Sequence, residues 1–451
     1  MRTRHRAALA TVSLAFAGLA VIAPDAAASG ATGGYDQFIV TFSNTTASKS
    51  AALPDVTPVR ELGSGGVVVR PAHGLDLPGA RRLMTKLAKH AGVASVEPDL
   101  IMTAQSEPND PLYKDQWDYY EPTGGMNLPG AWDRADGTGV TVAVIDTGIV
   151  KHADLNANVL PGYDFISDAT AARDGNGRDA DPTDQGDWYA AGECGETTPS
   201  NSSWHGTHVA GTIAALSNNG VGVAGIAPKA KILPVRVLGK CGGRTSDIVD
   251  AITWASGGKV ARVPANPTPA KVINMSLGGS GRCAAAYQKA INSAVSRGTT
   301  VVVAAGNSNA DVANFSPASC NNTISVAASD REGNRAFYSN FGTLIDFTAP
   351  GGEVRNETDA PGTRTKPQDG ILSTLNAGTT VAGAETYQTY MGTSMAAPHV
   401  AGLAALMLSR KALSPAQVES AIKAHVRPLP GTCSGGCGAG LVDAAATVGA
   451  L

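Results

Sequence analysis

The chain has 451 residues, a formal net charge of −3 and only 16% charged residues. This length allows one large catalytic domain and a smaller one, and the charge balance offers no basic surface for nucleic acid or acidic membranes. Glycine accounts for 53 of the 451 residues, or about 12%, whereas its usual share is about 7%. This excess predicts many tight turns around a packed apolar core.

Residues 1–28 predict a secretory signal peptide. The basic stretch MRTRHR is followed by an apolar run, residues 7–24, and by the small residues of DAAAS. A membrane anchor is the alternative, although this run is marginal in length and rich in alanine. We expect cleavage after Ala28 and a secreted, extracellular protein without a membrane partner, because no later stretch of the sequence is long and apolar enough to span a bilayer.

Export would place the six cysteines in an oxidising compartment, which favours three disulfides. We expect one short local loop and chain-order pairing of the other four: Cys433 with Cys437, Cys194 with Cys241, and Cys283 with Cys320. A zinc site is the alternative, but the sequence has no CxxC pair and no clustered histidines.

Residues 36–103 predict a small α+β unit. Strands are expected at 36–42, 65–72 and 93–99, and an amphipathic helix at 79–92. The polar segment that follows has the composition of a linker. We therefore expect three parts of the chain: 1–28, 29–106 and 107–451.

From about Asn109 onward, apolar β-branched runs alternate with helical segments, the pattern of a mostly parallel sheet flanked by helices. The expected strands are 139–148, 231–238, 271–279, 299–307 and 323–329, and the expected helices are 205–216, 245–256 and 285–298. Two strands end in DTG and AGN, and the carboxyl ends of such strands are the expected place for a site.

Three residues in three of these segments could form a hydrolytic triad. Asp146 ends a strand, His205 begins a helix, and Ser394 stands in GTSMAAPHVAG where a turn becomes a helix. Singly, each has an ordinary structural interpretation as a turn cap, a buried histidine or a helix cap. The chain order Asp, His, Ser is that of subtilisin-type triads, and Ala396 stands where an α/β-hydrolase elbow needs its second glycine.

The segments VIDTG, HGTHVAGT and GTSMAAPHVAG resemble the three signature blocks of the subtilases, the subtilisin-like serine proteases. The resemblance runs from about Asn109 to the end of the chain, and residues 36–103 resemble the inhibitory propeptide of that family. The long Asp-rich insert before the His block and the cysteines are similar to those of extracellular bacterial subtilases. The implied fold is a subtilisin-like α/β domain preceded by a small α+β propeptide domain.

The resemblance assigns a role to each catalytic residue. Ser394 would be the nucleophile, His205 the general base and then the acid, and Asp146 the residue that holds the imidazole tautomer. Asn307 would donate to the oxyanion beside the Ser394 backbone N–H. His208, one turn beyond His205, is expected to be structural; a His205/His208 metal pair would lack the Glu and the spacing of H-E-x-x-H.

The resemblance also implies that a peptide substrate pairs as an added strand between two segments. The residues expected to bind it are Ser276, Leu277, Gly278, Ala304, Ala305 and Gly306. Phe315 would lie near the floor of the pocket for the P1 residue, the one before the scissile bond, and a large apolar P1 residue is expected. An esterase or peptide ligase would use the same acyl-enzyme, whereas an inactive binding protein of this fold would need a changed triad position.

Structural Ca²⁺ is the cofactor that the resemblance implies. Oxygen ligands are expected from Asp110, Asp154, Leu216, Asn219, Val221 and Val223. The insert 168–187 offers a second set with calcium-loop spacing but without the bidentate Glu of an EF-hand: Asp168, Asp174, Asn176, Asp179 and Asp184. A solvated acidic loop is the alternative for the insert.

The sequence thus predicts a secreted, monomeric serine endopeptidase made as a preproenzyme. Its partners would be protein or peptide substrates and its own propeptide. Self-cleavage is expected between Thr103 and Glu107, and activity should require neutral His205.

Overall fold

The computed structural model describes residues 20–21, 35–43, 53–99 and 107–451. The chain divides into two compact units, residues 1–104 and 105–451. Most of the expected signal peptide and most of the expected cleavage segment lie outside the described residues. In the described part of the chain, no helix has the length and apolar character needed to cross a bilayer.

The first unit is a five-stranded sheet with one helix, ordered β1-β5-β2-β4-β3. Helix α1 begins after Asp76, whose side chain accepts a hydrogen bond from Gly79 N, and packs its apolar face on the sheet. The expected α+β unit is therefore confirmed. Its elements are β1 (Ala20–Val21), β2 (Phe38–Phe42), β3 (Val56–Glu61), β4 (Val67–Pro71), α1 (Leu77–Ala88) and β5 (Val93–Pro98).

The second unit is built on a parallel seven-stranded sheet, ordered β14-β13-β11-β9-β6-β8-β7. After β8 the chain crosses to the opposite side of β6, so the strand order reverses at β6. Such a reversal is where parallel sheets place their sites. The strands are β6 (Thr141–Asp146), β7 (Tyr163–Asp164), β8 (Lys231–Arg236), β9 (Val272–Met275), β11 (Thr300–Ala304), β13 (Ile324–Ser329) and β14 (Phe347–Pro350).

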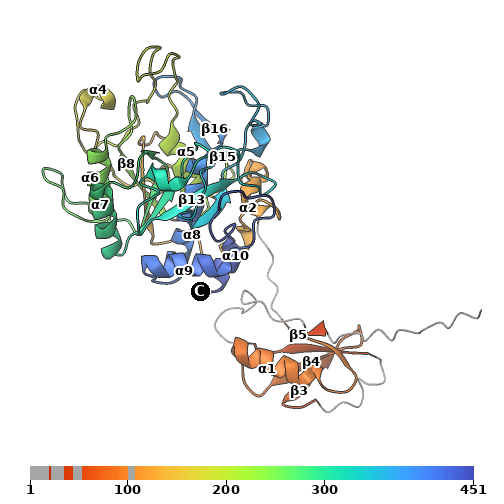
Figure 1. Ribbon diagram of the computed structural model, residues 1–451. Helices are drawn as coiled ribbons and strands as arrows, with labels where there is room; N and C mark the ends of the chain where they lie inside the picture. The colour runs from red at the N-terminus through yellow and green to blue at the C-terminus, as the bar shows by residue number, and fades with distance from the viewer. Residues whose placement is uncertain (1–19, 22–34, 44–52, 100–106) are drawn as a thin grey trace, which may run out of the picture. The chain divides into compact units, whose positions relative to one another are not determined.

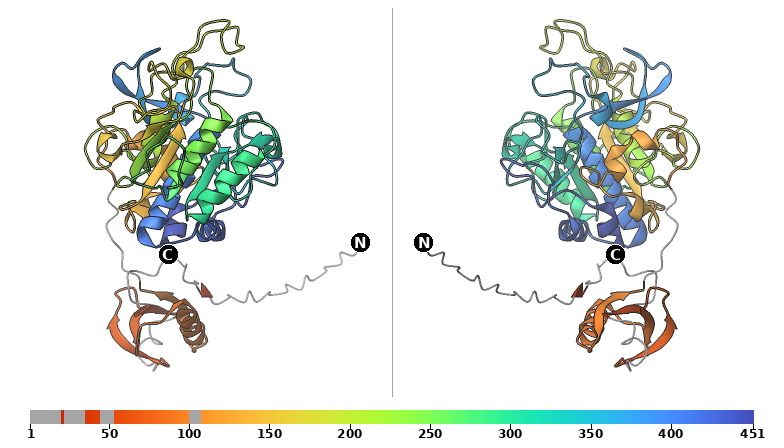
Figure 2. Two further views of the ribbon diagram at one scale, coloured as in Figure 1. Left: turned by 90° about the vertical axis from the view of Figure 1, so that its left-hand side faces the viewer. Right: turned by 90° about the vertical axis from the view of Figure 1, so that its right-hand side faces the viewer.

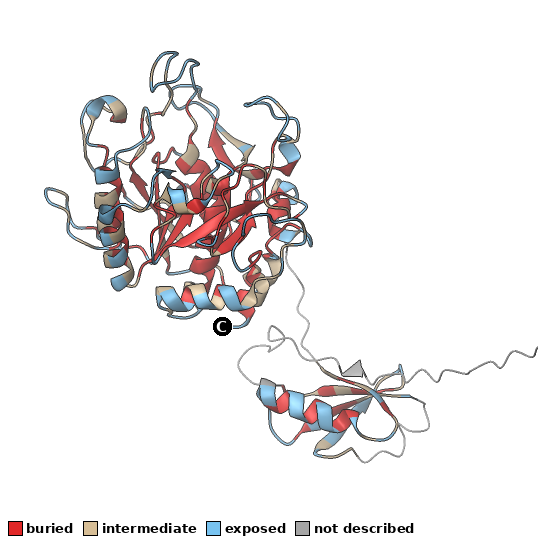
Figure 3. Cartoon of the chain, in the orientation of Figure 1, coloured by how far each residue is buried: buried red, intermediate tan, exposed pale blue. Residues whose placement is uncertain are grey.

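Helices cover both faces of this sheet (Figures 1 and 2). Alternate residues of β6 enter two cores: Val142 and Val144 pack under α5 and α8, whereas Ala143 and Ile145 pack under α6 and α7. Figure 3 shows the strands and α8 as the most buried elements. The helices are α2 (Trp117–Tyr120), α3 (Pro129–Trp132), α4 (Ala169–Ala172), α5 (His205–Ala214), α6 (Thr245–Ala255), α7 (Ala285–Ser296), α8 (Thr393–Arg410), α9 (Pro415–His425) and α10 (Ala444–Gly449).

Two small antiparallel pairs complete the unit. Strand β10 (Gly279–Ser280) pairs with β12 (Phe315–Ser316), and β15 (Ile371–Asn376) pairs with β16 (Glu385–Tyr390). Neither pair was predicted from the sequence, and nor were β7 and β14. The hairpin β15–β16 leads directly into α8 and so supports the segment that carries Ser394.

The three expected disulfides are confirmed: Cys194–Cys241, Cys283–Cys320 and Cys433–Cys437. The first ties the insert before α5 to the loop after β8. Cys283–Cys320 joins the residues before α7 to the loop between β12 and β13, and Cys433–Cys437 closes a short loop between α9 and α10.

Candidate active site

The three triad candidates lie at the ends of three buried elements. Asp146 is the last residue of β6, His205 is the first residue of α5, and Ser394 is the second residue of α8. Helix α5 starts close to the turn after β6, where a Cβ on Gly206 would overlap the carbonyl oxygen of Gly148. Only glycine permits this close approach, which brings His205 against Asp146.

Asp146 and His205 are directly hydrogen-bonded. The distance between His205 Nδ1 and Asp146 Oδ1 is 2.8 Å, and the same oxygen accepts a bond from Thr147 N at 2.8 Å. The Asp146 side chain is fully buried, whereas that of His205 is 20% exposed. The bond fixes the ring so that its other nitrogen, Nε2, is left for a further partner.

Burial lowers the pKa of His205, but the neighbouring carboxylates outweigh this effect. Asp146 contributes most, followed by Asp187 and Asp184, and together they raise the pKa above the ordinary value of 6.5. The imidazole is therefore a stronger base than an isolated histidine.

The start of α8 brings Ser394 and Asn307 together. Asn307 Oδ1 accepts hydrogen bonds from Thr393 N and Thr393 Oγ1, at 2.8 and 2.9 Å, which leaves its Nδ2 free to donate toward the cleft. Ser394 Oγ donates to the carbonyl oxygen of Ser276 at 3.2 Å. In the first turn of α8, Met395 N and Ala396 N donate to the Gly392 carbonyl, which leaves the Ser394 N–H without a hydrogen-bond partner among the described residues. Asn307 and Ser394, which both line the smaller cavity, thus have one side-chain and one backbone donor that no hydrogen bond of the described residues uses.

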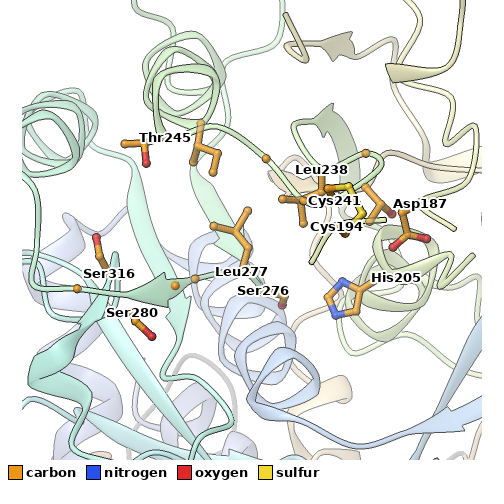
Figure 4. A pocket seen from close by; sticks show the side chains of 18 of the residues that line it. Asp187, Cys194, His205, Leu238, Cys241, Thr245, Ser276, Leu277, Ser280 and Ser316 are labelled. Carbon is orange, nitrogen blue, oxygen red and sulfur yellow. A yellow bond between two sulfur atoms is a disulfide. The ribbon is translucent and has the colours of Figure 1, made fainter. Parts of the chain in front are cut away.

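The expected substrate segments line two adjoining cavities. The smaller, about 310 Å³, is lined by Ser276–Ser280, Ala304–Ser308, Phe315 and Ser394. The larger, about 760 Å³, shares Ser276–Gly278 with the first and reaches His205. Figure 4 shows the larger cavity, with Asp187 and the Cys194–Cys241 disulfide beside His205.

Sequence reasoning missed a hydrogen-bonded chain behind the Asp–His pair. Gly206 N donates to Thr147 Oγ1 at 3.0 Å, and Thr147 Oγ1 donates to Asp184 Oδ2 at 2.6 Å. Thr147 and Gly206 are the residues that directly follow Asp146 and His205. The threonine of the DTG motif was the available signal, but its partner comes from the insert, 37 residues further along the chain.

His208 has the structural role expected of it. Its Nε2 lies 3.1 and 3.0 Å from the carbonyl oxygens of Ile371 and Gln388, and its ring stacks on Tyr390. Burial lowers its pKa to about 3, so it stays neutral. The residue holds α5 to the hairpin β15–β16.

The first expected calcium set gathers around the loop after α5. Asp110 accepts hydrogen bonds from the backbone N–H groups of Asn218 and Asn219, at 2.8 and 3.1 Å. Asp154 accepts from Asn219 Nδ2 at 2.7 Å and from Val223 N at 3.0 Å. These side chains and the carbonyls of this loop are hard oxygen ligands of the type that Ca²⁺ prefers. The set fits a calcium ion if the Asn219 amide turns its oxygen toward Asp154.

The second expected calcium set does not come together. Asp168 caps α4, Asp174 pairs with the buried guanidinium of Arg236 at 3.2 Å, and Asp184 binds Thr147. Asn176 and Asp179 bond to each other, with Nδ2 and Oδ2 2.9 Å apart. Within the described part of the chain, no group of three or more His, Cys, Asp or Glu residues is arranged to hold a metal. The acidic insert suggested a bound calcium ion, but the positive charge next to Asp174 is that of Arg236 on β8.

Comparison with known proteins places these features in a family. A parallel sheet with an Asp–His pair at its carboxyl edge and a serine at a helix start defines a hydrolase of the subtilisin type. The model of the "Subtilase family" matches residues 137–440, so the chain belongs to the subtilase family. This is a family of serine-type endopeptidases.

Two curated relatives are extracellular bacterial enzymes. The "Extracellular protease" of Xanthomonas campestris pv. campestris is 56% identical over 404 residues, which cover 89% of this chain and 67% of that protein. The "Extracellular basic protease" of Dichelobacter nodosus is 44% identical and is matched over 82% of this chain and 60% of its own length. The chain thus spans about two thirds of the length of these relatives.

A solved structure supports the fold assignment. The proteases from Pseudoalteromonas arctica PAMC 21717 align with a TM-score of 0.73 and 57% identity. The alignment covers 76% of this chain and 99% of that one.

Proposed function

We propose that the chain is a secreted serine endopeptidase made as a self-processing zymogen. The observation that carries the proposal is the 2.8 Å hydrogen bond between His205 and Asp146. Ser394 lies at the same edge of the sheet, at the start of α8, and the side-chain amide of Asn307 is bonded to this helix start. The names of the relatives support secretion and proteolysis.

In this mechanism Ser394 Oγ turns from the Ser276 carbonyl toward His205 Nε2 and gives it the hydroxyl proton as it attacks the substrate carbonyl. Asn307 Nδ2 and the Ser394 backbone N–H donate to the oxyanion. His205 then protonates the leaving amine, and a water molecule, deprotonated by the same imidazole, releases the acyl group. Asp146 stays ionised and stabilises the imidazolium.

The substrate backbone pairs with Ser276–Gly278 on one side and with Ala304–Gly306 on the other. Pairing through main-chain groups gives affinity for any extended peptide, and the cavities select side chains. This arrangement favours an endopeptidase over an esterase, because an ester substrate needs no second edge.

The zymogen has three parts in this proposal: a signal peptide at 1–28, a propeptide at 29–106 and a peptidase domain at 107–451. The propeptide assists folding and occupies the cleft until the enzyme cuts the linker between Thr103 and Glu107. Asp110, Asp154 and oxygens of the loop after α5 would hold a structural Ca²⁺ ion, which would strengthen a region otherwise held by hydrogen bonds.

A serine-directed fluorophosphonate probe tests the proposal. We expect covalent labelling of the wild type at Ser394, located by peptide mass spectrometry, and parallel loss of casein hydrolysis. Ser394→Ala should abolish both, and His205→Ala should slow labelling strongly while the fold is retained. Casein hydrolysis that persists in purified Ser394→Ala would contradict the proposal.

A further inference from the structure

The larger cavity has one wall that comes from the segment 184–203, which is the end of the insert and the residues between it and α5. Asp187, Tyr189, Cys194 and Glu196 line it, and the Cys194–Cys241 disulfide fixes this wall to the loop after β8. Residues 184–203 contain no Lys or Arg, and two of their four carboxylates, Asp187 and Glu196, line the cavity. This segment therefore gives the cavity a negative wall beside His205.

Asp187 is the acidic residue of this wall that acts most strongly on His205. It raises the pKa of His205 through its charge, second in this respect to Asp146, and Figure 4 shows it beside His205 at the cavity wall. Its two oxygens accept hydrogen bonds from Ser203 N and Ser203 Oγ, at 2.6 and 2.8 Å. These bonds hold the carboxylate in place without neutralising it.

Arg173 and Lys240 make their direct contacts with other groups, although Arg173 also interacts with Asp187 through its charge. Arg173 lies over the Trp188 ring, 4.0 Å from its centroid, and donates to the Gly186 carbonyl, while Lys240 pairs with Glu193. Arg282 lines the same cavity but is exposed, so solvent screens its charge. Among the described residues, no Lys, Arg or His lies within ion-pair distance of Asp187.

The peptide geometry determines which substrate residue meets this wall. Successive side chains of an extended strand point to opposite sides. Ser276–Gly278 borders both cavities. When a peptide pairs with this segment and its P1 side chain enters the smaller cavity, the preceding side chain, P2, points toward the larger one. His205 and Asp187 both line the larger cavity, so this is the wall that a P2 side chain would meet.

We propose that Asp187, in the wall built by residues 184–203, makes the enzyme select a cationic side chain, arginine or lysine, at P2. The inference rests on the proposed endopeptidase function and adds a substrate class to it. The partly buried, pre-positioned carboxylate recognises the cation by a charge-assisted hydrogen bond, and Glu196, at the exposed rim, adds a weaker and more strongly screened attraction.

The test compares two peptide substrates that differ only in charge. Both carry a large apolar P1 residue; one has arginine at P2 and the other has citrulline, an uncharged side chain of the same shape. At a pH on the upper plateau of the activity profile of each variant, we expect kcat/KM of the wild type to favour arginine by about 10-fold. The ratio should fall as ionic strength rises.

Variants separate recognition from a structural role. In Asp187→Asn we expect the ratio to fall below about 3-fold, whereas loss of Ser203 positioning alone would slow both peptides equally and leave the ratio unchanged. Glu196→Gln should lower the ratio slightly. Glu193→Gln is the matched control, since Glu193 pairs with Lys240 outside the cavity lining, and should keep the wild-type ratio.

Three outcomes are decisive. Equal cleavage of the two peptides by the wild type overturns the P2 inference but leaves the endopeptidase proposal standing. An arginine preference that survives in Asp187→Asn also overturns it, even if Glu196→Gln changes the ratio. Failure of the wild type to cleave either peptide, together with no casein hydrolysis, counts against the proposed function itself.

Discussion

Asp184, a residue of the insert, accepts a 2.6 Å hydrogen bond from Thr147, the residue that directly follows Asp146. The same threonine oxygen accepts a bond from the backbone N–H of Gly206, next to His205. One buried carboxylate therefore positions both the turn after the aspartate and the start of the helix that carries the histidine. Burial raises the pKa of Asp184 to about 7, although Thr147 and Gly186 oppose this through hydrogen bonds.

Weakening this chain should slow catalysis more than it weakens substrate binding. For Thr147→Val we expect kcat to fall about 10-fold with little change in KM, because small displacements of a base from its working position cost rate. Thr147→Ser keeps the hydroxyl and should restore most of the activity. Steady-state kinetics on a chromogenic peptide provide the measurement, and equal kcat values for the valine and wild-type enzymes would refute the positioning role.

The pH dependence of activity should follow the pKa of His205. The imidazole accepts a proton only when neutral, and its pKa is raised, so kcat/KM should decline as pH falls through a value above 6.5. Removing a neighbouring negative charge with Asp187→Asn should move this limb to lower pH. A profile whose acidic limb stays in place in this variant would show that Asp187 does not act on His205.

Loss of the oxyanion donor should reduce kcat without preventing substrate binding. For Asn307→Ala we expect kcat to fall about 100- to 1,000-fold, the loss known for the corresponding donor of subtilisin. KM should change little, since the donor faces charge that develops only in the transition state. Asn307→Ala also removes the acceptor for Thr393, so circular dichroism should confirm that the start of α8 remains folded.

The disulfides should differ in their effect on stability. Cys194–Cys241 spans 47 residues, and replacing both cysteines with alanine should lower the free energy of unfolding by about 2 to 4 kcal/mol. Cys433–Cys437 spans only 4 residues, so its removal should cost less. Thermal unfolding of the two double variants tests this order, and a larger loss for the short loop would reverse it.

Calcium should stabilise the peptidase domain through Asp110 and Asp154. At a free calcium concentration 100 times Kd, binding would stabilise the folded state by about 2.7 kcal/mol. Removing the calcium with a chelator should therefore lower the Tm of a domain of this size by about 4 °C. Asp110→Asn should unfold at the same temperature with and without the chelator. Equal chelator effects in wild type and variant would exclude this site.

The long elements could be predicted, and the triad candidates located, because each lies in a strongly patterned segment. β6, β11 and α8 are rich in apolar residues, and Asp146 and Ser394 stand at the end of β6 and the start of α8. β7 has two residues and β14 has four, too few for a periodic signal. The hairpin β15–β16 depends on packing against α5 more than on its own pattern.

The insert shows why the rest could not be predicted. The spacing of its acidic residues suggested a calcium site. In the structure, however, arginine side chains form the ion pairs in and around the insert, and each pair joins segments far apart in the chain. Arg236, on β8, bonds Asp164 and Asp174, while Arg178 of the insert pairs with Asp247 and Asp250 of α6. Partners that lie 60 or more residues away in the chain leave no trace in local spacing.

The intact mass of the secreted protein, wild type beside Ser394→Ala, tests the central claim most directly. The full chain would be expressed in a host without other extracellular proteases. We predict that the wild type loses its residues up to the segment between Thr103 and Glu107, and that Ser394→Ala is secreted with its propeptide still attached. Identical processing of the two proteins would contradict the claim that Ser394 is the nucleophile of a self-processing protease.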